Sequence, residues 1–423
     1  VERTFDFDTT PVEMDPIDSD IVVNKVEGLS KDFITGFDLS SYLSIIESGA
    51  TYKDFDGNEL DNAGFFKLLA DNGVNYVRLR VWVDPTDEDG NIYGGGNCDV
   101  ATAAKIGKYA TDAGMRVLVD FHYSDFWTDP GKQTAPKAWK SLSLTDKAET
   151  LREWTESSLK TIIDAGVDVG MVQVGNETTT GFCGETEMKD MCTLFKAGSE
   201  GVQNIESAYD KKIMIAIHLT NPDKIDFSNY AKGLEDNGVV YDVFATSYYP
   251  YWHGTLDNLK TKLSAVAEKY GKYVMVAETS YARTLEDGDG WENTESEKKL
   301  DQDEFPYEIS EQGQVNHFRN VISTISSIND NKGIGVFWWE PAWIPVGNYA
   351  DADNQEEVLE ANKILWEKYG SGWATSAAAG YDANVGEWYG GSAVDNESVF
   401  DFDGNALESL KLYNLIRGGS TAV

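Results

Sequence analysis

The sequence predicts an α/β fold, a (β/α)8 TIM barrel with long loop insertions after strands 7 and 8. Eight short runs of apolar and β-branched residues recur along the chain, and stretches with a helical spacing of apolar residues separate them. Nearly continuous apolar strands that alternate with helices are typical of a parallel sheet covered by helices. Eight repeats favour a closed barrel, and no GxGxxG or GxxxxGKS/T motif follows any run, which argues against a nucleotide-binding open sheet.

The predicted strands follow one another from residue 34 onward. They are Ile34–Leu39, Tyr76–Val81, Arg116–Phe121, Met171–Val174, Ile213–Ile217, Val243–Ser247, Tyr273–Ala277 and Gly335–Trp339. The amphipathic stretches between them predict helices at Leu60–Asn72, Val100–Ala113, Leu144–Ala165 and Leu256–Tyr270. A glycine directly follows each of these helices, as is typical of a helix C-terminus.

Two parts of the chain lie outside this repeating pattern. Residues 1–30 are acidic, contain two prolines and show no clear period, which predicts an N-terminal extension before a catalytic barrel of residues 31–423. The chain is also longer than the roughly 250 residues of a simple barrel, so loops must carry insertions. The sequence places them at Thr284–Gln314, after the seventh strand, and at Pro341–Tyr389, after the eighth.

Composition excludes several classes of function. The 423 residues include 35 Lys and Arg against 72 Asp and Glu, a net charge of −37, which disfavours nucleic acid and anionic membranes as partners. No apolar stretch approaches the roughly 20 residues of a membrane-spanning helix. Three cysteines are too few for a disulfide framework; Cys183 and Cys192 could form one bridge or remain free. The acidic, Cys-poor composition is typical of a secreted protein, whose signal peptide is not in this chain.

The chemistry is expected where the strands end, because barrel enzymes carry their reactive groups at the C-terminal ends of strands. Glu177 follows the fourth predicted strand and Glu278 follows the seventh. These strands face each other across the barrel mouth, so the two carboxyls can approach to about 5–5.5 Å, the separation of a double-displacement glycosidase. Either glutamate alone could equally be a strand-end carboxylate paired with an arginine. Both together, with Asn176 before the first, favour catalysis.

Several long segments resemble glycoside hydrolase family 53, the arabinogalactan endo-β-1,4-galactanases. Gly-Asn-Glu at 175–177 and Ala-Glu-Thr at 277–279 are similar to the motifs of the wider clan of retaining barrel glycosidases. The segments specific to the family are GFDLSSYLSIIESG (36–49), NYVRLRVWVDP (75–85), DFHYSDFWTDPGKQTAPKAW (120–139), GMVQVGNET (170–178), YDVFATSYYPYWHGTL (241–256), VMVAETSYA (274–282), GIGVFWWEPAWIPVG (333–347) and GSGWATS (370–376). The resemblance implies hydrolysis inside β-1,4-galactan, the side chain of type I arabinogalactan and pectin.

The resemblance also assigns the two catalytic roles. It makes Glu177 the general acid/base and Glu278 the nucleophile. Asn176 is placed to hold the sugar 2-hydroxyl, an interaction that strengthens as positive charge develops on the ring. The nucleophile must stay ionised, so it needs nearby cations or hydrogen-bond donors; the candidates are Arg78 or Arg80, with Arg80 nearer the mouth, and Tyr248.

Aromatic and polar side chains near the strand ends are the expected sugar contacts. Of the two consecutive residues Trp338 and Trp339, only one can face the barrel interior, and the resemblance favours Trp339. The other expected contacts are His122 with Tyr123 in the subsite next to the scissile bond, Asp129 and Lys132 as polar groups, and Trp127, Trp252 and Trp343 as stacking platforms, although for any single Trp core packing remains an equal alternative.

A cation site is expected in the first insertion. Asp287, Asp289, Trp291 and Asn293 stand at alternate positions of a glycine-rich turn, the arrangement in which hard cations find oxygen ligands. Bacterial members that this loop resembles bind calcium here, and they tend to carry His where this chain has Trp291; a backbone carbonyl ligand tolerates that change. We therefore expect one structural calcium ion as the cofactor.

Two alternatives stay open at this point. Another retaining barrel endo-glycanase, a mannanase or cellulase, shares the two-glutamate scaffold and differs only in its loops. A non-catalytic polysaccharide-binding barrel would share the fold alone. Because galactan is neutral, the net charge of −37 gives no attraction to the substrate, and we expect a soluble monomer whose partner is the polysaccharide.

Overall fold

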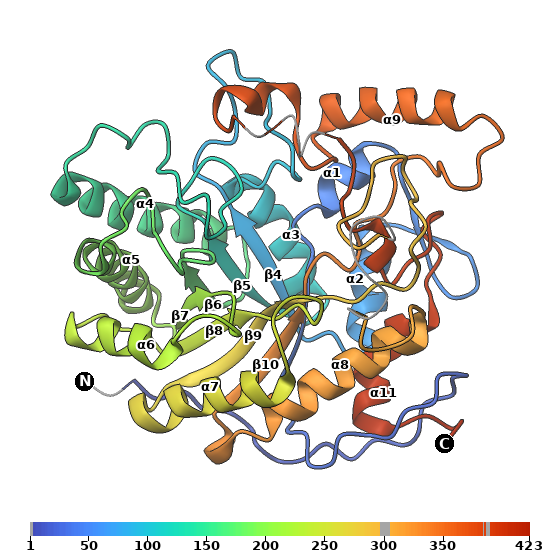
Figure 1. The fold of residues 1–423 in the computed structure, drawn as a ribbon, viewed down its shortest axis with the longest axis horizontal. Helices are drawn as coiled ribbons and strands as arrows, with labels where there is room; N and C mark the ends of the chain where they lie inside the picture. The colour runs from blue at the N-terminus through green and yellow to red at the C-terminus, as the bar shows by residue number, and fades with distance from the viewer. Residues whose placement is uncertain (1–2, 297–304, 384, 386–389) are drawn as a thin grey trace.

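Eight parallel strands close into a barrel in the computed structural model, which describes residues 3–296, 305–383, 385 and 390–423 (Figure 1). The order around the barrel is β1-β10-β9-β8-β7-β6-β5-β4, closed by pairing of β1 with β4, so the predicted fold class is confirmed. The strands are β1 (Ile34–Asp38), β4 (Tyr76–Val81), β5 (Arg116–Phe121), β6 (Val169–Val174), β7 (Met214–Leu219), β8 (Val243–Ser247), β9 (Tyr273–Thr279) and β10 (Gly333–Trp338).

Helices cover the outside of the barrel and connect successive strands. The four predicted from spacing are confirmed, and side chains cap their first turns: Asp61, Asp99, Ser143 and Thr255 each accept a backbone N–H. The outer helices are α2 (Asn62–Asp71), α3 (Val100–Asp112), α4 (Leu144–Asp164), α5 (Met188–Tyr209), α6 (Phe227–Asp236), α7 (Leu256–Tyr270), α8 (Glu311–Ser326) and α11 (Leu412–Gly418). A short helix α1 (Tyr42–Glu47) and the hairpin β2 (Tyr52–Lys53) and β3 (Glu59–Leu60) lie between β1 and α2.

The barrel interior is packed with side chains and is not a pore. Leu118, Met171, Met275 and Phe337 belong to one buried apolar cluster contributed by different strands. Gly36 on β1 makes room for it, because a Cβ at this position would lie 2.2 Å from the Phe337 ring. The lower barrel is therefore filled, and only its mouth is left for chemistry.

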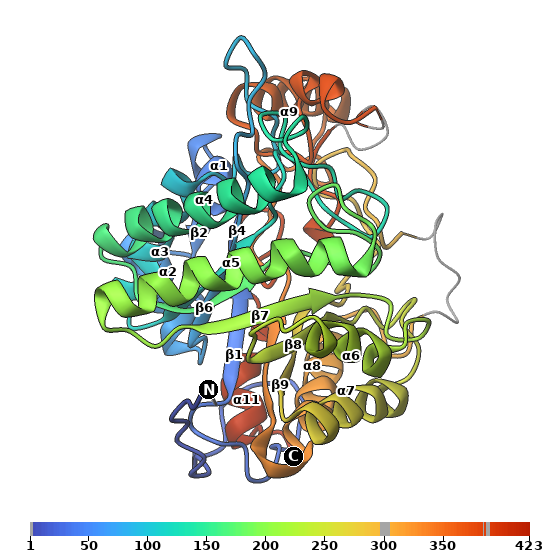
Figure 2. The ribbon, with the colours of Figure 1, turned by 90° about the vertical axis from the view of Figure 1, so that its left-hand side faces the viewer.

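The N-terminal extension lies against the opposite end of the barrel from the mouth. Phe5 and Phe7 pack against the interior apolar cluster, and Arg3 forms ion pairs with Glu206 at 2.7 Å and Asp242 at 2.9 Å. Figure 2 shows both chain ends at this side of the molecule, with α9 (Gln355–Tyr369) at the other side. The extension therefore covers the barrel floor and leaves the mouth uncovered.

Two long segments rise above the mouth, one between β9 and α8 and one between β10 and α11. These positions agree with the predicted insertions, although residues 297–304, 384 and 386–389 of them lie outside the described residues. The segments join each other through backbone and side-chain hydrogen bonds: Thr294 N donates to Ala393 O at 2.8 Å, and Asn396 Nδ2 donates to Glu295 O at 2.8 Å. Together they form one wall above the barrel.

The three cysteines are buried and free, which settles the open question about Cys183 and Cys192. Burial raises the pKa of the Cys183 thiol to about 12 and that of the Cys192 thiol to about 11, so both are protonated at neutral pH. Of the helices in the described part of the chain, none combines the length and apolar character that crossing a bilayer requires.

Candidate active site

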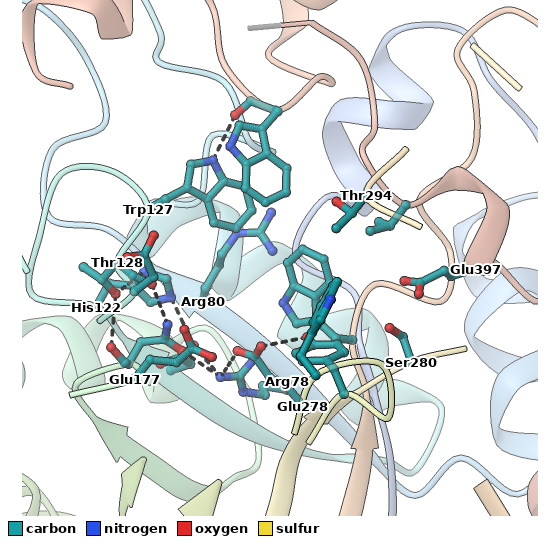
Figure 3. A pocket seen from close by; sticks show the side chains of 18 of the residues that line it. Arg78, Arg80, His122, Trp127, Thr128, Glu177, Glu278, Ser280, Thr294 and Glu397 are labelled. Carbon is teal, nitrogen blue, oxygen red and sulfur yellow. Dashed lines mark hydrogen bonds and ion pairs between the residues drawn. The ribbon is translucent and has the colours of Figure 1, made fainter. Parts of the chain in front are cut away.

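A pocket opens at the C-terminal ends of the strands, under the wall formed by the two insertions. Figure 3 shows Glu177 and Glu278 close to Arg78, with Trp127 and Arg80 on one side and Ser280, Thr294 and Glu397 on the other. The residues that line the pocket are Arg78, Arg80, Asp120, His122, Trp127, Thr128, Asp129, Asn176, Glu177, Tyr249, Trp252, Glu278, Ser280, Thr294, Glu295, Trp339, Trp373, Val394 and Glu397.

Glu177 and Glu278 meet inside this pocket. One carboxyl oxygen of each lies within 4.8 Å of the other. Retaining glycosidases hold their two carboxyls about 5–5.5 Å apart, whereas inverting enzymes leave room for a water between carboxyls roughly 6.5–9.5 Å apart. The geometry therefore suits direct attack by one carboxylate on the sugar.

Glu278, the last but one residue of β9, is held by two donors. Arg78 on β4 lies 3.0 Å from Oε1, and the Tyr249 hydroxyl donates to Oε2 at 2.9 Å. Burial raises the pKa of Glu278, while the positive charge of Arg78 and the Tyr249 hydrogen bond act against that rise. These two contacts stabilise the ionised form that a nucleophile needs.

Arg78 itself is almost fully buried and organises the bottom of the pocket. Its guanidinium also pairs with Asp38 at 3.0 Å and Asp120 at 2.9 Å, and it donates to Asn176 Oδ1 at 3.0 Å. Because Asn176 accepts through Oδ1 and donates through Nδ2 to a backbone carbonyl at 3.0 Å, the orientation of its amide is fixed. An oriented Asn amide next to the acid/base candidate is what a sugar 2-hydroxyl would require.

Glu177 lies just beyond β6, in a left-handed backbone conformation with φ of 48°. Such a conformation is strained for a residue with a side chain, and in native structures it concentrates at functional sites. Its Oε1 accepts a hydrogen bond from Ser247 at 2.7 Å. Burial raises the pKa of Glu177 well above its usual value, and the nearby Glu278 carboxylate raises it further. A raised pKa keeps this carboxyl protonated and suits a general acid.

Tryptophan rings form one side of the pocket. Trp127 stacks on Trp373 with ring centroids 4.3 Å apart, and the Arg80 guanidinium lies 4.2 Å from the Trp127 ring. Trp339 lines the pocket, while its neighbour Trp338 is buried and stacks on Phe318 of α8. The alternation predicted for these two tryptophans is confirmed.

A second cluster of carboxylates lies in the wall, away from the catalytic pair. Asp287, Asp289 and Asp395 each place one oxygen within 4.8 Å of the others. Burial, and then the charges of the other two, raise the pKa of Asp289 well above its usual value, and burial together with Asp287 raises that of Asp395 to about 8. Asn293 donates to Asp395 at 2.7 Å, and Trp291 N donates to Asp289 at 2.8 Å. Such repulsion among buried carboxylates fits a site whose charge a hard cation would balance.

Comparison with known proteins identifies the family. Residues 34–413 match the model of glycosyl hydrolase family 53. The chain belongs to this family. It is 52% identical to "Endo-beta-1,4-galactanase" of Bacillus subtilis, over 95% of this chain and 90% of that protein. It is 35% identical to "Arabinogalactan endo-beta-1,4-galactanase" of Cellvibrio japonicus, over 74% of this chain and 81% of that protein. The solved structure "Ignisphaera aggregans GH53 catalytic domain" superposes with a TM-score of 0.80 at 37% identity, covering 94% and 99% of the two chains.

In this family 53 chain, most of the expected sugar contacts come together in the pocket. The predicted residues that line it are Arg80, His122, Trp127, Asp129, Asn176, Trp252 and Trp339. Of the two arginines offered as the partner of the nucleophile, Arg78 is the one that pairs with Glu278, whereas Arg80 pairs with Glu340 at 2.5 Å. Tyr123, expected beside His122, is instead buried, and its hydroxyl pairs with Thr155 of α4.

Besides Tyr123, three expected contacts are not among the described residues that line the pocket. The hydroxyl of Tyr248 donates to Gly254 O at 2.9 Å, and the next residue, Tyr249, contacts Glu278 instead. Side chains alternate along the end of β8, so Ser247 and Tyr249 face the pocket and Tyr248 faces away.

The other two expected contacts have partners elsewhere. Trp343 is fully buried and parallel to Trp373, with ring centroids 6.0 Å apart, so Trp373 rather than Trp343 lines the pocket. Lys132 forms an ion pair with Asp382, in which its ammonium nitrogen lies 2.8 Å from the carboxylate.

Sequence reasoning missed the residues that the insertions bring to the site. Thr294, Glu295 and Glu397 line the pocket, and Asp395 completes the carboxylate cluster. Trp373 lies in the quoted segment 370–376, so a signal for it was present, but nothing in the sequence showed its direction.

Proposed function

We propose that this chain is a retaining endo-β-1,4-galactanase that hydrolyses internal β-1,4-galactosidic bonds of galactan and type I arabinogalactan. The observation that carries the proposal is the pair of carboxyls within 4.8 Å in a pocket of a family 53 barrel. We infer the substrate from the 52% sequence identity to an endo-β-1,4-galactanase. A mannanase or cellulase remains the alternative from the same clan, and a non-catalytic barrel is disfavoured because both carboxyls are present.

The reaction proceeds in two displacements. In the first, the carboxylate of Glu278 attacks the anomeric carbon while Glu177 gives its proton to the leaving glycosidic oxygen, which forms a galactosyl ester on Glu278. In the second, Glu177, now ionised, takes a proton from water, and the resulting hydroxide displaces Glu278 and restores the original configuration. Asn176 lies where its amide can bind the 2-hydroxyl, and this bond strengthens in both transition states.

The charges of the pocket support this division of roles. Glu278 is next to Arg78 and the Tyr249 hydroxyl, which favour its ionised form, whereas Glu177 has no cation within ion-pair distance among the described residues. The Glu278 carboxylate also raises the pKa of Glu177. Once Glu278 forms the ester and loses its charge, the pKa of Glu177 falls, which is what its change from acid to base requires.

The substrate assignment is tested by measuring the release of reducing ends from galactan, mannan and cellulose. We expect rapid release of oligosaccharides from galactan alone. Glu278→Gln should abolish turnover. Glu177→Gln should cut kcat/KM on galactan roughly 100-fold or more, whereas an aryl β-galactoside whose leaving group needs no protonation should still undergo a fast first displacement, followed by slow hydrolysis of the ester. Turnover of mannan or cellulose in preference to galactan would contradict the proposal, and binding of galactan without turnover would favour the non-catalytic barrel.

We further propose that the wall cluster holds one structural calcium ion. The supporting residues are Asp287, Asp289 and Asp395, which supply carboxylate oxygens from both insertions. The ion would join the two segments and neutralise their buried charge. All steps of the reaction are assigned to Glu177 and Glu278, so the proposed ion has a structural role.

We propose that the protein is secreted, works as a monomer and degrades the galactan side chains of pectin. The negative surface supports this picture only through solubility, since a net charge of −37 gives no attraction to a neutral polymer and repels the acidic pectin backbone.

A further inference from the structure

His218, at the end of β7, is a neutral imidazole with a defined tautomer. Its Nδ1 accepts a hydrogen bond from the backbone N–H of Glu177 at 3.1 Å and lies 3.0 Å from Nε2 of Gln173. The backbone N–H can only donate, so Nδ1 carries no proton. Burial, and then the charge of Arg78, lower the pKa of His218 well below its usual value. The single imidazole proton is therefore on Nε2.

The Nε2 proton determines the direction of the next hydrogen bond. Nε2 lies 3.0 Å from Ser247 Oγ, so His218 donates and the serine oxygen accepts. Ser247 is fully buried, and its own hydroxyl proton points to Glu177 Oε1 at 2.7 Å. Backbone N–H, imidazole and hydroxyl thus form a chain in which every donor is assigned.

We propose, on the basis of the proposed galactanase function, that His218 and Ser247 are positioning residues that fix the acid/base Glu177 and select the oxygen that carries its catalytic proton. Oε1 receives the Ser247 hydroxyl in both protonation states, so the proton transferred to the glycosidic oxygen is held on Oε2. His218 also holds the backbone N–H of Glu177 in its left-handed conformation. The hydrogen bond from Ser247 to the carboxyl and the hydrogen bond from the Glu177 N–H to His218 together orient the carboxyl before substrate binds.

Other charged groups also face Glu177, and they do not replace this chain. Glu278 on β9 and Asp129 on the loop after β5 raise the pKa of Glu177, and Arg78 on β4 lowers it. The Tyr249 hydroxyl donates its proton to Glu278. Among the described residues, Ser247 is the hydrogen-bond donor to the Glu177 carboxyl, and its loss leaves the ionised form less stable.

Ser247→Ala tests the chain, because it removes the hydroxyl without adding bulk. Hydrogen bonds to ionised groups are strong enough that the basic limb of the kcat/KM profile on galactan should move up by roughly one to two pH units. The rate on galactan should fall, while an aryl β-galactobioside with a good leaving group should be cleaved nearly as fast as by the parent. Thr246→Val is the control, because it removes a neighbouring hydroxyl that donates to a backbone carbonyl. The basic limb of its kcat/KM profile should lie at the same pH as in the parent.

A second variant keeps the test decisive. His218→Asn retains an oxygen that can accept the Glu177 N–H and removes the Nε2 proton, so it should move the basic limb in the same direction by a smaller amount. The proposal is overturned if Ser247→Ala lowers the rate equally on both substrates and leaves the basic limb in place, since this is the result of a merely structural role. Parent activity on galactan, measured alongside, reports separately on the galactanase function itself.

Discussion

At the level of single residues, the two catalytic carboxyls differ in the donors that reach them. Among the described residues, Arg78 and the Tyr249 hydroxyl donate to the Glu278 carboxyl, and the Ser247 hydroxyl donates to the Glu177 carboxyl. Two chemically identical groups therefore start the reaction in different protonation states. This difference depends on neighbours contributed by β4 and by the end of β8, which makes it accessible to point substitutions.

Tyr249→Phe should weaken the nucleophile. In the parent protein, the hydrogen bond from Tyr249 lowers the pKa of Glu278. The substitution removes this bond, so the pKa of Glu278 rises and the acidic limb of the kcat/KM profile moves to higher pH. We expect a shift of about one pH unit and a loss of roughly tenfold in kcat/KM at the parent's optimum, measured on galactan.

Tyr248→Phe is the matched control for this substitution. This variant also loses a tyrosine hydroxyl, but the hydroxyl of Tyr248 donates to Gly254 O and not to a group in the pocket. We expect unchanged pH limbs. Equal shifts in both variants would show that the assignment of Tyr249 to the nucleophile is wrong.

At the level of elements, the strands and the positions of the insertions were predictable, but the residues that the insertions bring to the site were not. Strands such as Val117–Phe121 of β5 are buried on both faces, so they appear as unbroken apolar runs whose ends mark the reactive positions. This rule located Glu177 and Glu278, and the family resemblance assigned their proposed catalytic roles. Trp373 and Asp395 lie in loops without periodicity, and Asp395 meets Asp287 only through tertiary packing across more than a hundred residues.

The error at Tyr248 has a different cause. The end of β8 was located correctly, but which of two adjacent tyrosines faces the pocket depends on the register of the strand end. The pairing of β8 with β9 shifts between Thr246 and Ser247, and a sequence carries no direct signal for such an irregularity.

The two insertions should depend on calcium for their stability. Removal of the proposed ion would leave the buried carboxylates of Asp287, Asp289 and Asp395 without a counter-charge, so excess chelator should lower Tm by about 5 °C or more. Differential scanning calorimetry with and without added calcium measures this.

Asp395→Asn separates the cluster from general effects of the chelator. This variant should melt below the parent in calcium and respond weakly to chelator, whereas Asp56→Asn, at an exposed position, should respond like the parent. An identical Tm for the parent in calcium and in chelator would remove the calcium proposal.

At the level of the whole molecule, the N-terminal extension and the pocket are located at opposite ends of the barrel. The N-terminal extension covers the barrel floor, at the side where both chain ends lie (Figure 2), and the pocket opens at the mouth. Substitutions in the extension should therefore leave the pocket intact. Arg3→Ala would leave the largely buried Asp242 carboxylate without its partner. Since Arg3 is partly exposed, we expect a loss of about 1–3 kcal/mol in the free energy of unfolding, measured by urea denaturation.

Catalysis should not follow this loss of stability. The kcat/KM of Arg3→Ala on galactan should equal that of the parent at temperatures well below the transition. Asp6→Asn, at an exposed position of the same segment, serves as the control and should change neither quantity. A fall in kcat/KM without unfolding would mean that the floor and the mouth are coupled.

The joining of the two insertions edge to edge has a consequence for engineering and for evolution. Thr294 and Glu295 from one segment and Val394 and Glu397 from the other complete the same wall, and the carboxylate cluster is divided in the same way. A chimera that exchanged one loop with a relative would receive half of a wall and part of a cluster. We therefore expect that selectivity for the polymer and resistance to heat are transferred only when both loops are transplanted together.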